Sequence, residues 1–98
     1  MTIQSRDRTE IIRQILDTAN SAEGITKIKL MYMSFLTYRQ VKEYLVLLTE
    51  NHLLFYDSLT HTYKTNEKGV RLLKFCNKLE DIMKGLQPSQ QPRKQQAA

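Results

Sequence analysis

The sequence has no tryptophan, one cysteine, two prolines and three glycines among 98 residues. The lone cysteine, Cys76, excludes an intramolecular disulfide and any zinc site that is built on paired cysteines. No apolar run approaches the roughly 18 residues of a membrane span. The first residues lead into charge, so we expect no signal peptide. These absences predict a cytoplasmic protein with no membrane segment.

Catalytic and metal-binding patterns are also missing. We find no glycine-rich phosphate loop, no paired Ser–His or Cys–His, and no carboxylate pair in an apolar setting. The two histidines, His52 and His61, are isolated, and no acid has the spacing that would complete a metal site. We therefore expect neither an enzyme nor a bound metal or other cofactor.

Positive charge is in excess. Fifteen Lys and Arg against ten Asp and Glu give a net charge of +5, and the pI is near 9.5. This balance favours a polyanionic partner, either nucleic acid or an anionic membrane surface.

Residues 87–98 hold Arg93 and Lys94, no acid, both prolines and five glutamines. This composition predicts a disordered tail after a single folded domain.

Two helices are expected in the first third of the chain. The first covers about residues 6–22, where apolar side chains recur at helical spacing. The second is capped by Thr26 and ends at residue 31 or 33. We expect it to bury Ile28, Leu30 and Met31. Ile25, between the two helices, is expected to bridge to a later hairpin.

A third helix is predicted over residues 37–50. Thr37 and Gln40 have the spacing of a capping box, in which each side chain satisfies an amide of the first turn. The apolar stripe of this helix consists of Val41, Tyr44, Leu45 and Leu48. Only three or four residues separate it from the second helix, which is the spacing of a helix-turn-helix.

A β-hairpin follows. Residues 53–56 and 62–65 have strand composition, and residues 57–60 have turn chemistry. A two-stranded hairpin is marginally stable alone, so we expect it to lie on the apolar sides of the helices.

The last predicted helix covers residues 66–86, with Thr65 as its cap and Gly69 packed closely against the hairpin. Its length of about 31 Å exceeds what one small domain can cover. Apolar residues recur along it at steps of three and four. We expect Leu72, Leu73 and Phe75 to pack inward, with Cys76 as a small core residue. A dimer contact is assigned to Leu79, Ile82, Met83 and Leu86, although the same stripe could simply complete the domain's own core.

The predicted fold is mainly α with a small β-ribbon: a winged helix-turn-helix body over residues 1–65, a long C-terminal dimerisation helix over 66–86, and the tail 87–98. On double-stranded DNA the recognition helix, about 37–50, would enter the major groove. The wing, 53–65, would meet the backbone or the minor groove. The alternative is a winged-helix module that binds protein and not DNA.

The candidate DNA contacts follow from this placement. Arg39 suits guanine, and Gln40 suits adenine unless it is used in the cap. The other candidates in the major groove are Tyr38, Lys42 and Glu43. Phosphates are assigned to Arg6, Arg8, Lys27 and Lys29, and the wing offers His61 and Lys64.

The chain resembles the small archaeal winged-helix DNA-binding proteins in its first two helices, in the recognition helix and in the wing. The most specific part of the resemblance is Tyr63-Lys64-Thr65 followed by Lys68-Gly69. That group includes chromatin-like proteins and transcriptional regulators whose last helix forms an antiparallel coiled-coil dimer. The likeness covers about residues 6–86. It implies a homodimer that binds DNA through Arg39, Gln40, Lys42 and Lys64. The last helix is shorter here than in the chromatin-type members, which leaves the dimer geometry open. Both roles, transcriptional control and nucleoid organisation, also stay open.

Overall fold

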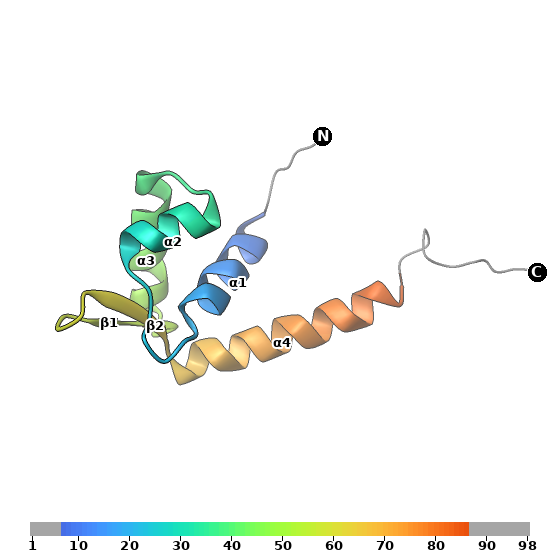
Figure 1. The fold of residues 1–98 in the computed structure, drawn as a ribbon. Coiled ribbons are helices and arrows are strands. Elements are labelled where there is room, and N and C mark those ends of the chain that lie inside the picture. The colour runs from blue at the N-terminus through green and yellow to red at the C-terminus, as the bar shows by residue number, and fades with distance from the viewer. Residues whose placement is uncertain (1–6, 87–98) are drawn as a thin grey trace, which may run out of the picture.

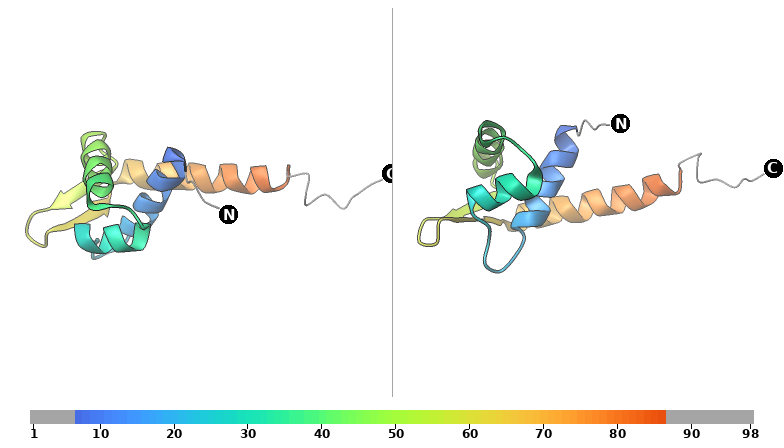
Figure 2. Two further views of the ribbon diagram at one scale, coloured as in Figure 1. Left: turned by 90° about the horizontal axis from the view of Figure 1, so that it is seen from above. Right: turned by 45° about the horizontal axis from the view of Figure 1, so that its top comes forward.

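The computed structural model describes residues 7–86 (Figure 1). Arg6 and the tail 87–98 lie outside the described residues. The elements follow one another as α1 (Arg8–Ala19), α2 (Lys27–Ser34), α3 (Tyr38–Glu50), β1 (Leu54–Asp57), β2 (Thr62–Thr65) and α4 (Glu67–Lys84). Three helices and the hairpin form a body from which α4 extends to one side (Figures 1 and 2). The prediction of a mainly helical fold with one small ribbon is confirmed.

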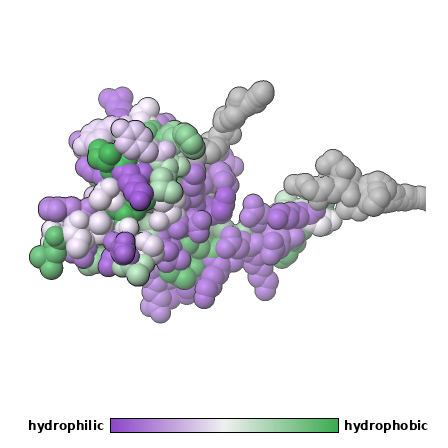
Figure 3. All heavy atoms as spheres, viewed as in Figure 1, coloured by the Kyte–Doolittle hydropathy of each residue, from purple (hydrophilic) through white to green (hydrophobic). Residues whose placement is uncertain are grey.

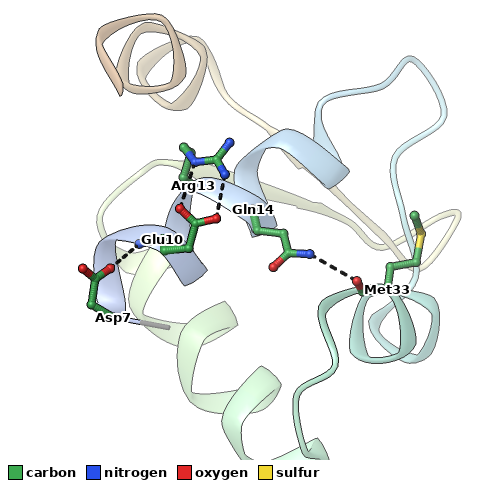
Figure 4. Close-up of polar contacts among 5 residues, drawn as sticks. All are labelled: Asp7, Glu10, Arg13, Gln14 and Met33. Carbon is green, nitrogen blue, oxygen red and sulfur yellow. Dashed lines mark hydrogen bonds and ion pairs between the residues drawn. The ribbon is translucent and has the colours of Figure 1, made fainter. Parts of the chain in front are cut away.

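Helix α1 begins at Arg8, directly after its cap Asp7, whose carboxylate accepts a hydrogen bond from the Glu10 amide at 2.9 Å (Figure 4). Glu10 in turn pairs with Arg13 at 2.7 Å, and this hydrogen bond raises the pKa of Arg13 above its ordinary value. The Gln14 amide donates to the Met33 carbonyl and so ties α1 to the end of α2. The predicted helix over 6–22 was too long, because the chain bends after Asn20.

The predicted caps of α2 and α3 are confirmed. Thr26 accepts from the Lys29 amide at 3.2 Å. In α3 both halves of the capping box form, with 3.1 Å from the Gln40 amide to the Thr37 hydroxyl and 2.9 Å from the Thr37 amide to the Gln40 side chain. These contacts fix the residue at which each helix begins.

The burial predicted for α2 was partly wrong. Leu30 is fully buried, but Ile28 is 51% exposed, and Met31 is only partly buried against the core. The reason is that an eight-residue helix presents one narrow stripe inward, which here consists of Leu30 and Ser34, four residues apart.

One hydrophobic cluster draws on every helix and on β1. Leu48 and Leu54 are among its fully buried side chains, and α4 contributes Leu73. The buried members are Ile15, Leu16, Ala19, Ile25, Leu30, Leu36, Val41, Leu45, Leu48, Leu54 and Leu73. The body is therefore a single domain into which only the first part of α4 is packed.

The hairpin is antiparallel, with Tyr56 opposite Tyr63. The predicted bridge from Ile25 is confirmed by two backbone hydrogen bonds to Tyr63, at 2.9 and 2.7 Å. The Thr65 hydroxyl donates to the Leu16 carbonyl of α1 at 2.6 Å. The prediction that Thr65 caps α4 was wrong, because its hydroxyl is already used in this hydrogen bond. Asn66 occupies the cap position instead.

The predicted close approach at Gly69 is confirmed. A Cβ at this position would lie 2.5 Å from the Leu53 carbonyl oxygen and 2.6 Å from the Thr65 methyl group. Only a residue without a side chain lets the first turn of α4 come this near to the hairpin.

The end of α4 extends beyond the body (Figures 1 and 2), whereas Leu79 and Glu80 still border a hollow together with Thr9 and Arg13 of α1. The helix has 18 residues, about 27 Å at 1.5 Å per residue, and so is shorter than predicted. All residues from 77 to 86 are exposed. Phe75, predicted to pack inward, is 65% exposed, because α1 runs along the side of α4 that carries Cys76 and Glu80. Cys76 is half-buried.

No helix within residues 7–86 has the length and hydropathy of a membrane span.

We predict that Gly69→Ala lowers the free energy of unfolding by about 1–3 kcal/mol, because the new methyl group meets backbone that cannot yield freely. Urea denaturation followed by circular dichroism measures the loss. Gly85→Ala is the matched control, since a Cβ there would meet only the Ile82 carbonyl at 3.5 Å. Equal stability of the two variants would contradict the packing described for Gly69.

Candidate nucleic-acid interface

The exposed face of α3 carries charge of opposite sign at its two ends. Arg39 and Lys42 lie exposed in the first two turns, followed by Glu43 and, at the last turn, Glu50. The amino end of a helix also carries the positive end of its dipole. The first turns of α3 are thus the part of this helix best suited to an anion.

Gln40 is used in the cap. Its side-chain oxygen accepts from the Thr37 amide, so pairing with adenine through both groups of the side chain would require opening the cap. Gln40 also borders a hollow of about 250 Å³, together with Arg8 and Glu43. The structure therefore brings Arg8 of α1 to the flank of α3 that carries Gln40.

Lys27 of α2 lies against Tyr38 of α3. Its ammonium nitrogen is 3.4 Å from the tyrosine oxygen and 5.2 Å from the ring centroid, which is the range of a cation–π contact. Lys29 is exposed but lies about 200° further around α2. The two lysines therefore point to different sides of the helix, and only Lys27 joins α3.

Between α3 and the hairpin runs a groove of about 380 Å³, which we call the hairpin groove. Lys27 and Lys42 border it, and Tyr56 and Tyr63 form its hairpin side. The two tyrosine rings are 4.8 Å apart between centroids. His61 is 3.0 Å from the Tyr56 hydroxyl. The structure therefore gathers Lys27, Lys42 and His61 around one surface.

Sequence reasoning interprets Tyr56 and Tyr63 as core or rim residues and assigns them no functional role. The signal was present in the strand alternation, because residues opposite each other in an antiparallel pair project to the same face. The register, which places Tyr56 opposite Tyr63, depends on the turn and could not be fixed from composition.

Lys64 lies apart from this group. It is opposite Phe55 and so projects from the hairpin face that is turned away from the hairpin groove. Figure 3 shows a hydrophobic group, coloured green, at the outer end of the hairpin, and Leu59 of this turn is 90% exposed. Lys64 and His61 would therefore meet a ligand from different sides of the hairpin.

The turn at the hairpin tip depends on Asp57. Its carboxylate accepts from the Leu59 amide at 2.9 Å, and this hydrogen bond is the main reason that the pKa of Asp57 is lowered.

Within residues 7–86 no three of the His, Cys, Asp and Glu side chains gather in a way that could hold a metal ion.

Helices α2 and α3 joined by a short turn, with a hairpin beside the second of them, define a winged helix-turn-helix protein. The chain belongs to the winged helix-turn-helix family, which it matches over residues 5–84. A search of curated proteins finds no match. Membership of this family indicates DNA binding or regulation in general terms.

We predict that the Leu59 amide reports the ionisation of Asp57. A lowered pKa means that the carboxylate stabilises the turn fully above its unfolded value of about 3.9 and loses this effect as the pH falls through the folded value. The Leu59 amide shift, followed by NMR from pH 6 to 2, should therefore titrate with a midpoint below the ordinary pKa of an aspartate.

Asp57→Asn is the control for this titration, because the amide oxygen can still accept the bond but does not titrate in this range. Its Leu59 signal should be flat. A midpoint at or above the ordinary value in the unsubstituted protein would be evidence against the hydrogen bond.

Proposed function

We propose that this protein binds double-stranded DNA as a homodimer, with α3 in the major groove and the hairpin on the backbone or in the minor groove. It acts by binding and not by catalysis, uses no cofactor, and works in the cytoplasm on the nucleoid. The observation that carries the proposal is the exposed, capped amino end of α3, where Arg39 lies beside Lys42 and Lys42 borders the same groove as Lys27.

The chemistry of this end suits the major groove. The first turns of a recognition helix are those that reach base edges. Arg39 can donate two hydrogen bonds to guanine, and Glu43 can accept from cytosine. Lys42 and Lys27 lie where phosphates would flank the helix, and Tyr38 between them offers a hydroxyl for a sugar or phosphate. Arg8 and Lys29 add weaker, peripheral charge.

The resemblance to small archaeal winged-helix DNA-binding proteins supports two roles, transcriptional regulation and nucleoid organisation. A regulator needs base-specific contacts, whereas an architectural protein needs mainly phosphate contacts. In this chain Arg39 and Glu43 are the candidates for base contacts that decide between the two roles, because Gln40 is held by the cap.

The homodimer is proposed from α4. Leu79, Ile82, Met83 and Leu86 are exposed at steps of three and four, and Phe75 joins the same stripe. Apolar side chains in this arrangement form the seam of a coiled coil. Two turns of seam are marginal in isolation, so contacts between the two bodies would have to add to it.

A protein-binding role is the second candidate. The exposed side of α2 and its turn carries Ile28, Tyr32 and Phe35, of which Phe35 is 87% exposed at a positive φ of 56°. Such a patch is a common feature of protein interfaces, and at Ile28 it adjoins Lys27 and Tyr38 of the proposed DNA surface.

The direct test is binding of random-sequence duplex DNA by fluorescence anisotropy across a salt series. About four phosphate contacts per subunit predict a log–log slope near −7 for a dimer, at roughly −0.9 per contact. No binding at low salt would reject the proposal and favour the protein-binding role.

Two variants separate base contacts from phosphate contacts. Arg39→Ala should lower the binding free energy by about 1–3 kcal/mol and relax base preference, whereas Lys64→Ala should weaken all sequences alike and flatten the slope by about one. Lys74→Ala, a charge change on the exposed surface of α4, is the control and should change little. Equal effects of all three variants would mean that only net charge matters.

The dimer is tested by sedimentation of Leu79→Glu combined with Ile82→Glu. Buried in an apolar seam, two carboxylates per helix would be strongly unfavourable, so a monomer of unchanged helicity is expected. Lys74→Glu combined with Lys78→Glu makes a larger charge change on α4 without altering the apolar stripe, and it should leave the dimer intact. A dimer that survives the first pair would place the interface elsewhere.

A further inference from the structure

We propose that the hairpin groove binds a small aromatic carboxylate that carries a second polar group, and that this ligand opposes DNA binding. The effect on DNA rests on the proposed function. Binding in the groove does not, because the groove is complete in the protein alone.

The groove has the size and lining of a small-molecule site. Its volume of about 380 Å³ lies within the roughly 300–1,000 Å³ that is usual for such sites. Tyr56 and Tyr63 form an aromatic wall, and Leu45 and Val46 of α3 supply apolar surface. Aromatic rings pack favourably against tyrosine faces and edges. The body of the ligand is therefore expected to be a flat ring system.

The charges around the groove indicate where a carboxylate would bind. Lys27 and Lys42 border the groove. Glu50, the acid of the groove lining, lies eight residues beyond Lys42 and thus about 12 Å further along α3. An anionic group bound at the lysines would form charge-assisted hydrogen bonds and remain distant from Glu50.

A buried hydroxyl in the lining supplies the third element. Thr49 lines the groove, and its side-chain oxygen is shielded from solvent with no hydrogen-bond partner. Buried hydroxyls are nearly always paired. Thr49 lies seven residues from Lys42, two turns along the same side of α3 and about 10 Å away. A ligand held by its carboxylate at the lysines would place a polar group at its far end near Thr49, and the Thr49 hydroxyl would turn towards the groove to pair with it.

These features connect ligand binding to DNA binding. Lys27 and Lys42 are proposed phosphate contacts, and a bound carboxylate would neutralise them. The aromatic rings of the ligand would also fill the space between α3 and the hairpin, and both of these elements have to approach the duplex. Ligand and DNA should therefore compete.

The first experiment measures binding to the full chain without DNA, using the fluorescent probe 6-hydroxy-2-naphthoate. Saturable binding of one probe per subunit is expected. Removing the carboxylate, as in 2-naphthol, should weaken binding at least tenfold. Removing the hydroxyl, as in 2-naphthoate, should weaken it severalfold. Absence of saturable binding would overturn the inference.

Variants locate the probe. Lys42→Gln should weaken binding of 6-hydroxy-2-naphthoate at least tenfold, whereas Lys74→Gln, the matched change on α4, should leave it unchanged. Thr49→Val keeps the shape of the side chain and should abolish the preference for 6-hydroxy-2-naphthoate over 2-naphthoate. Because Thr49→Val removes an unpaired hydroxyl, it is expected to fold normally. Binding that is indifferent to both Lys42→Gln and Thr49→Val would overturn the site.

The second experiment adds the probe to a preformed complex with duplex DNA and follows anisotropy. Release of DNA that needs a severalfold higher probe concentration in Thr49→Val supports competition, and unchanged anisotropy at saturating probe overturns it. The two proposals fail separately. A protein that binds the probe but never DNA would refute the proposed function alone, whereas one that binds DNA but not the probe would refute this inference alone.

Discussion

The seating of the hairpin on the helices is the constraint on which the other features depend. Two strands of four residues cannot hold their shape alone. The Ile25 bridge, the Thr65 bond to α1 and the buried Leu54 fix the hairpin against the body. Because Gly69 lets α4 start immediately beside it, the same contact sets the direction in which α4 leaves. The hairpin groove exists only because β1 and β2 are held at this distance from α3.

Much of this fold was predictable because it is encoded locally. The capping box of Thr37 and Gln40 and the cap at Thr26 need only residues three positions apart. The apolar stripe of α3 needs only helical periodicity. Gly69 could be anticipated because glycine in a helix is unfavourable unless something packs closely against it.

The remainder depended on contacts between distant segments. Thr65 is a good cap by composition, yet its hydroxyl bonds to Leu16, 49 residues away. Phe75 continues an apolar stripe, and periodicity alone does not show which side of α4 the helix α1 covers. For the candidate site, the exposed charges of α3 were predictable. The aromatic wall of Tyr56 and Tyr63 was not, because it requires the strand register, and neither was the separation of Lys64 from His61.

The central claim is that one surface, formed by the amino ends of α2 and α3 and by the hairpin, binds duplex DNA. NMR shift mapping of the labelled full chain during titration with a short duplex tests this claim most directly. The account predicts the largest amide shifts in the first turns of α3, at Lys27 and in the hairpin, with residues 77–86 of α4 nearly unmoved. Shifts confined to α4, or none at saturating duplex, would contradict it.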